Sequence, residues 1–331
     1  MRDLRRLPKA HLHLHLEGAM RPSTLAELAA AAGVPVPPVR GYGSFTAFAD
    51  MYVAACDVIR SEADLRRLVD EVVADAADDG AAWVEPALYV PRHRSRLGSD
   101  DHILEVVLDE LAQAGARHGV GTGLVVAADR TVDPDEAAEQ AHLAARHARS
   151  GVVGLGLAND EVGFPPDGFV EAYAVARDAG LLSVPHAGEL EGPASVWGAL
   201  TALGADRVQH GVRAVEDPAL VELLADRGTC LDVCPTSNLL LAVVPSLAEH
   251  PLPALLAAGV RCSLNADDPL LFGPGLLAEY EVVRAEMGLD DEALAAVARA
   301  SIEASGAPDA LKGKAAAGVD AWLASPAAAA S

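Results

Sequence analysis

Cysteine is scarce in this chain, with four residues among 331. So few cysteines, scattered through a chain of this length, cannot form the disulfide framework of a small secreted domain. The sequence also lacks an apolar run of about 18 residues, and no basic segment followed by an apolar one opens it, which argues against a membrane span and a cleaved signal. These absences predict a cytoplasmic protein with no membrane partner.

Positive charge is also in short supply. The chain has 25 lysines and arginines against 48 aspartates and glutamates, a formal net charge of −23. This excess repels a phosphate backbone, so we expect no nucleic-acid partner. No Gly-x-Gly-x-x-Gly follows a predicted strand, so a dinucleotide site lacks its usual support. A small molecule is the expected partner, and the oligomeric state is left open.

The sequence does contain a regular alternation of short apolar segments with helical patterns. Eight strands are predicted, at residues 10–18, 82–88, 121–127, 152–157, 181–186, 207–210, 230–233 and 261–265. Eight strand–helix units favour a closed parallel (β/α)8 TIM barrel over an open doubly wound sheet. We expect one domain over residues 1–325, with extra helices after the first strand and at the C-terminus, and a low-complexity tail at 326–331.

Three histidines alternate along the first strand, at His11, His13 and His15. Successive side chains of a strand point to opposite faces, so the three imidazoles are predicted to share one face and the leucines between them the other. Two imidazoles about 7 Å apart on one face can converge on a metal ion where the strand ends. The alternative is a half-buried strand whose polar face happens to be histidine.

Polar residues gather where the predicted strands end, which is where barrel enzymes place their reacting groups. Three histidines and a carboxylate are the kind of ligands that hold a catalytic zinc or iron: His13, His15, His186 and Asp267. Four further groups could supply the acid, base and orienting functions of a metal-assisted hydrolysis: Glu17, Glu189, His210 and Asp268.

Structural alternatives stand beside these assignments. Asp267 and Asp268 could form a solvated N-cap pair before a helix. Cys234 and Cys262 are predicted to be small core residues. The remaining histidines are predicted to lie in solvent on helices or loops: His93, His102, His118, His142, His147 and His250.

Five blocks, in order, resemble the signature motifs of the adenosine deaminase family of metal-dependent amidohydrolases. They are Pro8 to Gly18, His186-Ala-Gly-Glu189, Gln209-His210-Gly211, Cys234-Pro-Thr-Ser-Asn238 and Ser263-Leu-Asn-Ala-Asp-Asp-Pro269. The resemblance implies a zinc-dependent hydrolytic deamination of a 6-aminopurine nucleoside, such as adenosine or deoxyadenosine, to the 6-oxo product and ammonia. Adenine deaminase, or another amidohydrolase of the same fold, is the alternative.

The resemblance also implies a role for each matching residue. The zinc ligands, with Fe²⁺ as an alternative metal, are matched by His13, His15, His186 and Asp267, which leaves His11 a packing or supporting role. Glu189 matches the acid that protonates purine N1, and His210 matches the residue that orients and helps deprotonate the attacking water. Asp268 matches the carboxyl group near N7, and Glu17 matches a position that reaches the ribose hydroxyl in nucleoside-using members.

The chain departs from the family pattern after the fourth strand. Asn159 stands where the family has a glycine whose amide lies near purine N3. A side chain therefore projects where backbone would approach the ligand, so Asn159 is a candidate substrate-binding residue and adenosine itself is in doubt. Adenine and 6-amino-6-deoxyfutalosine are alternative substrates, and AMP is disfavoured because no basic cluster is predicted near the pocket mouth.

A helical pattern over residues 44–59 interrupts the strand–helix alternation and carries three aromatic residues, Phe45, Phe48 and Tyr52. An apolar helix in this position could act as a lid over the mouth of a pocket. Packing of the same side chains into the core is the alternative.

Overall fold

The computed structural model describes residues 1–326, so the predicted tail lies outside the described residues except for Pro326. Eight parallel strands follow one another around a barrel in the order β1-β2-β4-β5-β6-β7-β8-β9, and the short β3 pairs with β2. This confirms the predicted (β/α)8 barrel. The strands are β1 (Lys9–His15), β2 (Ala81–Leu88), β3 (Gly121–Thr122), β4 (Leu124–Asp129), β5 (Val152–Ala158), β6 (Leu182–Ala187), β7 (Arg207–His210), β8 (Cys230–Val233) and β9 (Arg261–Leu264).

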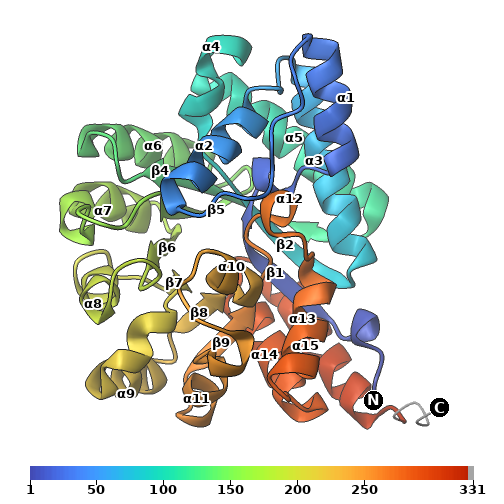
Figure 1. The fold of residues 1–331 in the computed structure, drawn as a ribbon, viewed down its shortest axis with the longest axis vertical. Helices are drawn as coiled ribbons and strands as arrows, with labels where there is room; N and C mark the ends of the chain where they lie inside the picture. The colour runs from blue at the N-terminus through green and yellow to red at the C-terminus, as the bar shows by residue number, and fades with distance from the viewer. Residues whose placement is uncertain (327–331) are drawn as a thin grey trace.

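Helices surround the strands, as Figure 1 shows, and extra helices follow β1 and β9 as predicted. Those between β1 and β6 are α1 (Pro22–Ala32), α2 (Phe45–Cys56), α3 (Glu62–Asp78), α4 (Arg94–Leu97), α5 (Asp100–His118), α6 (Pro134–His147) and α7 (Val170–Asp178). Those after β6 are α8 (Pro193–Thr201), α9 (Pro218–Arg227), α10 (Pro235–Leu240), α11 (Leu252–Ala257), α12 (Pro269–Phe272), α13 (Leu276–Glu286), α14 (Asp291–Ala304) and α15 (Asp309–Ala324). Among the described residues, no helix is long and apolar enough to cross a membrane.

The barrel closes where the last strand meets the first. Leu14 and Asp267 form a parallel bridge just beyond the end of β9. The His15 amide donates to the Asp267 carbonyl at 3.0 Å, and the Asp267 amide donates to the His13 carbonyl at 3.1 Å. This seam therefore places Asp267 beside the two histidines at the end of β1.

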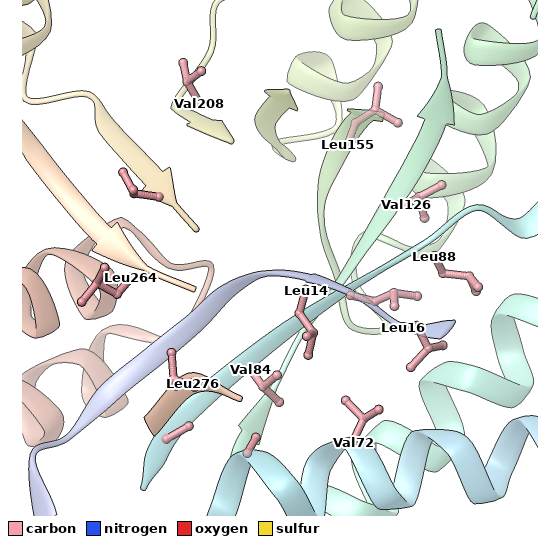
Figure 2. Packing of buried hydrophobic residues seen from close by; sticks show 14 of the residues in the cluster. Leu14, Leu16, Val72, Val84, Leu88, Val126, Leu155, Val208, Leu264 and Leu276 are labelled. Carbon is pink, nitrogen blue, oxygen red and sulfur yellow. The ribbon is translucent and has the colours of Figure 1, made fainter. Parts of the chain in front are cut away.

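The hydrophobic core lies on both sides of the strand wall. Figure 2 shows Leu14 and Leu16 on the side of β1 that faces helix α3, where Val72 lies. Inside the barrel, Leu12 packs in a separate small cluster with Trp83. Packing on both faces is typical of the strands of a parallel barrel and holds their ends in fixed positions.

One predicted strand is divided. The segment 121–127 forms β3 and β4, which are separated at Gly123. A β-carbon at Gly123 would lie 2.8 Å from both the Trp83 ring and Val153, so the chain needs a glycine here to pass the large Trp83 side chain.

Candidate active site

The histidine strand contains an irregularity that the sequence pattern does not reveal. The pairing of β1 with β2 shifts register between His11 and Leu14. The consecutive amides of Leu12 and His13 both donate to the Asn265 side chain, at 2.7 and 3.1 Å. A bulge of this kind breaks the alternation of side chains. The prediction that His11 shares a face with His13 and His15 is therefore wrong: the His11 ring accepts a hydrogen bond from the Ala266 amide at 3.1 Å instead.

The predicted metal ligands lie at the carboxyl ends of the strands, where the donor atoms form two groups close enough to share an ion. One group is His13, His186, His210 and Asp267, and the other is His15 with Asp267 and Asp268. His13 Nε2 lies 3.1 Å from His186 Nε2 and 3.3 Å from Asp267 Oδ1. His15 Nε2 lies 3.2 Å from the same Asp267 oxygen. Two metal–nitrogen bonds of 2.0–2.1 Å at a tetrahedral angle separate their nitrogens by roughly 3.3 Å, so these distances suit one zinc-sized ion.

The protonation of the cluster also suits a cation. His13 Nδ1 lies 3.2 Å from the Asp232 carbonyl, and this contact orients the ring so that Nε2 faces the cluster. Burial, followed by the charges of His13 and His15, holds the pKa of His186 well below its usual value. Burial lowers the pKa of His15, but Asp268 and Asp267 outweigh it and raise this pKa to about 9. The carboxylates thus create a negative potential that a bound cation would neutralise.

His210 approaches the same cluster, with Nε2 3.9 Å from Asp267 Oδ2. A chain of hydrogen bonds sets its tautomer. The Leu252 amide donates to His250 Nδ1 at 3.1 Å, so the His250 proton lies on Nε2, which donates to the Asn238 carbonyl oxygen at 3.2 Å. The Asn238 amide then donates to His210 Nδ1 at 3.2 Å. The His210 proton must therefore lie on Nε2, where it points into the site rather than leaving that nitrogen free for a metal.

This arrangement corrects one prediction. His250 was expected in solvent, but it is only 4% exposed. Burial lowers its pKa to about 4, and burial together with the charge of His13 lowers the pKa of His210 to about 3. Both rings are therefore neutral at physiological pH, and the hydrogen-bond chain keeps its direction.

Glu189 faces the cluster as a carboxyl group suited to proton donation. Burial, followed by the charges of Asp267 and Glu161, raises the pKa of Glu189 well above its usual value. Its Oε1 has no hydrogen-bond partner among the described residues and lies 3.4 Å from His210 Nε2. A carboxyl group that stays protonated at neutral pH can act as a general acid.

Glu161 holds the loop that carries Glu189. Its carboxylate accepts hydrogen bonds from four consecutive backbone amides, those of residues 188–191, at 2.7 to 3.1 Å. Hydrogen bonds to a carboxylate are stronger than those between neutral groups, so this loop is firmly placed. Sequence reasoning missed Glu161, although its position after a strand end was a usable signal.

A small pocket of about 100 Å³ opens from the cluster. Its lining includes His15, His186, Asp267, Glu189 and His210 from the strand ends, together with Phe45, Phe48 and Tyr52 of α2. Phe48 also stacks on Phe272, with ring centroids 5.2 Å apart. The α2 aromatic residues therefore line the pocket and pack against one another at the same time.

Asn159 and Asp268 both line this pocket. Asn159 has a positive φ of 80°, and its amide donates to Asp129 at 2.9 Å. Asp268 Oδ1 has no hydrogen-bond partner among the described residues, and burial, above all, raises the pKa of Asp268 well above its usual value. A β-carbon on Gly18 would lie 1.6 Å from this oxygen, so Gly18 leaves the space that Asp268 occupies.

Backbone strain is concentrated at this site. Among residues 1–326, the non-glycine residues with a positive φ are Asn159, His210, Ala242 and Asp267. Three of these four line the pocket. Left-handed backbone at a non-glycine residue costs about 1–3 kcal/mol and is found preferentially at functional sites.

Glu17 does not line the pocket. Its Oε1 accepts a hydrogen bond from His93 Nε2 at 2.6 Å, and its Oε2 accepts one from the Tyr52 hydroxyl at 2.8 Å. His93 is fully buried, so the prediction that it lies in solvent is wrong. Its position on the short 3-10 helix η3 (Val90–His93), directly after β2, brings it to the strand end next to η2 (Glu17–Ala19).

Other residues of the lining were not predicted. Asp129 ends β4, and Tyr89 and Arg92 follow β2. Asp129 could have been found from its position at a strand end. Arg92 brings a single guanidinium to the pocket rather than a cluster of basic residues, with its carbon Cζ 5.6 Å from the Tyr89 ring centroid.

An eight-stranded barrel with a buried cluster of imidazoles and a carboxylate at the carboxyl ends of its strands defines a metal-dependent barrel hydrolase. Residues 8–322 match the family described as Adenosine deaminase, and the chain belongs to that family. It is an aminohydrolase with a buried His and Asp metal site.

Individual relatives match over nearly their whole length. A Streptomyces coelicolor protein, named provisionally as an adenosine/adenine deaminase, is 45% identical over 98% of this chain and 98% of its own. The crystal structure of adenine deaminase from Arthrobacter aurescens superposes with a TM-score of 0.90 at 33% identity, covering 96% of this chain and 99% of that one. A zinc-bound amidohydrolase from Burkholderia ambifaria gives a TM-score of 0.88 at 28% identity, covering 97% of this chain and 93% of that one.

Proposed function

We propose that this aminohydrolase catalyses zinc-dependent hydrolytic deamination of a 6-aminopurine ring, replacing the amine at C6 with oxygen and releasing ammonia. The observation that carries the proposal is the convergence, in the lining of one small pocket, of a metal-ligand cluster and the buried carboxyl group of Glu189, whose Oε1 has no hydrogen-bond partner among the described residues. The ring is common to adenosine, 2′-deoxyadenosine, adenine and 6-amino-6-deoxyfutalosine.

The metal would be held by His13, His15, His186 and Asp267, whose donor atoms lie 3.1–3.3 Å apart in the pairs that contact one another. When bound, the metal supplies a strong nucleophile at neutral pH by lowering the pKa of a water molecule to about 7. The Ser237 hydroxyl donates to Asp267 Oδ2 at 2.7 Å and so orients this carboxylate.

Proton donation to the ring is assigned to Glu189. Attack at C6 places electrons on the ring, and a proton delivered to N1 prevents negative charge from accumulating there. His210 orients the attacking water by donating its Nε2 proton, because Nδ1 is held as an acceptor by Asn238. Burial raises the pKa of Asp268 well above its usual value, and in its protonated form Asp268 would donate to N7, which is a hydrogen-bond acceptor.

The variant Glu189→Gln tests this assignment. We expect it to bind zinc as the wild type does and to lose roughly 100-fold to 10,000-fold in kcat, the usual contribution of a general acid. Ammonia release and the zinc content of the purified protein are the two measurements. Near-normal turnover by the variant would contradict the role of Glu189, and a metal-loaded wild type that releases no ammonia from any of the four substrates would contradict the function.

A further inference from the structure

Helix α2 is fastened over the pocket by a buried arrangement of three side chains. Tyr52 lies on α2, Glu17 on η2 after β1, and His93 on η3 after β2. Both carboxylate oxygens of Glu17 are engaged, one by His93 at 2.6 Å and the other by Tyr52 at 2.8 Å. Glu17 is 1% exposed and His93 is fully buried. We refer to Tyr52, Glu17 and His93 as the lid latch.

The lid latch engages both carboxylate oxygens of Glu17. A carboxylate accepts strongly directed hydrogen bonds, and the two shortest contacts of this group go to protein donors rather than into the pocket. Glu17 is buried and does not line the pocket, whereas Tyr52 does, so a substrate hydroxyl could reach Glu17 only if the surrounding residues moved. The Tyr52 ring also lines the pocket and stands 6.1 Å from the His15 ring, so it limits the space in front of the cluster.

The orientation of the purine in the pocket determines which part of the substrate faces helix α2. Deamination places C6 at the metal-ligand cluster and N1 at Glu189, and N9 lies across the purine from C6. A substituent on N9 therefore points away from the cluster and must be accommodated by the rest of the lining, which includes Phe45, Phe48 and Tyr52 of α2. The pocket volume of about 100 Å³ is below the roughly 300–1,000 Å³ of clefts that hold drug-sized ligands.

We propose that Tyr52 and His93 are specificity-determining residues, which through Glu17 hold α2 closed and restrict the enzyme to the free 6-aminopurine base. The inference rests on the proposed deamination of 6-aminopurines. Nucleosides are excluded because their sugar would have to open the lid latch and leave buried polar groups without partners, a loss that gives strong discrimination.

The test compares kcat/KM for adenine and adenosine in the zinc-loaded enzyme. We expect the wild type to favour adenine by about 100-fold or more, the discrimination available when buried polar groups would be left unpaired. Tyr52→Phe removes only the hydroxyl, and Tyr52→Ala removes the ring as well. The preference for adenine is expected to fall in the order wild type, Tyr52→Phe, Tyr52→Ala, with the adenosine kcat/KM rising in absolute terms.

The matched control is Tyr42→Phe, because Tyr42 is a buried tyrosine that packs on Phe48 without contacting Glu17. It should leave the substrate ratio unchanged. A second variant, His93→Gln, should lower the preference in the same direction as the Tyr52 variants. Comparable turnover of adenosine, or of 6-amino-6-deoxyfutalosine, by the wild type would overturn the inference, as would Tyr52 variants that lower both activities equally. Absence of ammonia from every substrate would overturn the proposed function instead.

Discussion

Glu279 is a buried carboxyl residue on helix α13, and burial raises its pKa to about 7 although the Thr236 amide, 3.3 Å away, opposes the shift. In the unfolded chain this pKa is about 4.3. Between these two pH values the folded state keeps a proton that the unfolded state has released, so the free energy of unfolding decreases as the pH rises from about 4.3 to about 7.

The variant Glu279→Gln should remove this dependence, since glutamine keeps the shape of the side chain without a titrating proton. We expect it to be more stable than the wild type at pH 8, by up to about 4 kcal/mol at roughly 1.4 kcal/mol per pKa unit, and similar to it near pH 4. Urea unfolding at the two pH values measures the difference. An equal change in stability at both would contradict the prediction.

Single residues also mark the limit of what the sequence could predict. The residue types at the strand ends were sufficient to select His186, Glu189 and Asp267, which the structure brings together. His93 could not be placed, because its burial depends on Glu17 and Tyr52, which lie 76 and 41 positions away in the chain. A histidine in a loop has no local signal that separates a solvent position from a buried one.

Helix α10 and the segment just before α11 support the site through two side chains that do not line the pocket. Asn238 on α10 and His250, just before α11, set the tautomer of His210. Replacing His250 by leucine would remove the donor that fixes the Asn238 amide, which could then present its oxygen to His210. We expect His250→Leu to lower kcat about tenfold or more, as misorientation of a catalytic group does, with little change in zinc content.

The histidine at position 142 provides the control for that substitution, because it is exposed on α6. His142→Leu should leave kcat unchanged. A second variant, Asn238→Asp, tests the direction of the chain: it has no amide to donate to His210 Nδ1 and should be impaired even with His250 present. Normal kcat in both His250→Leu and Asn238→Asp would show that the tautomer is set in another way.

Among the helices and strands, the regular elements were predictable from the sequence and the irregular ones were not. Periodicity located the strands and the segment that forms α2, since burial of one face imposes a fixed spacing. The bulge in β1 was missed because its cause, the Asn265 side chain, comes from the far end of the chain. The division at Gly123 was missed for the same reason, because Trp83 belongs to a different strand.

For the whole molecule, the proposed metal links binding to stability. The candidate ligands come from β1, from β6 and from the segment after β9, so a bound ion would cross-link strands on both sides of the seam. Removing zinc with a chelator should abolish ammonia release and lower the melting temperature. Free zinc at about 1,000 times its Kd contributes roughly 4 kcal/mol of stability.

Restoring zinc should recover both ammonia release and the melting temperature. Calorimetry with and without chelator measures the melting temperature. Asp267→Ala, which lacks a candidate ligand, should show a melting temperature that no longer responds to zinc. A wild-type protein whose melting temperature is the same in both conditions would contradict the prediction.

The bridge between Leu14 and Asp267 also has a consequence for biosynthesis. A nascent chain leaving the ribosome carries two imidazoles of the cluster almost at once, but their carboxylate partner emerges only after some 250 further residues have been added. During that interval no complete coordination site exists, so an incomplete chain cannot bind the ion with the full set of ligands. Acquisition of zinc and completion of the fold would therefore coincide, late in the life of the nascent chain.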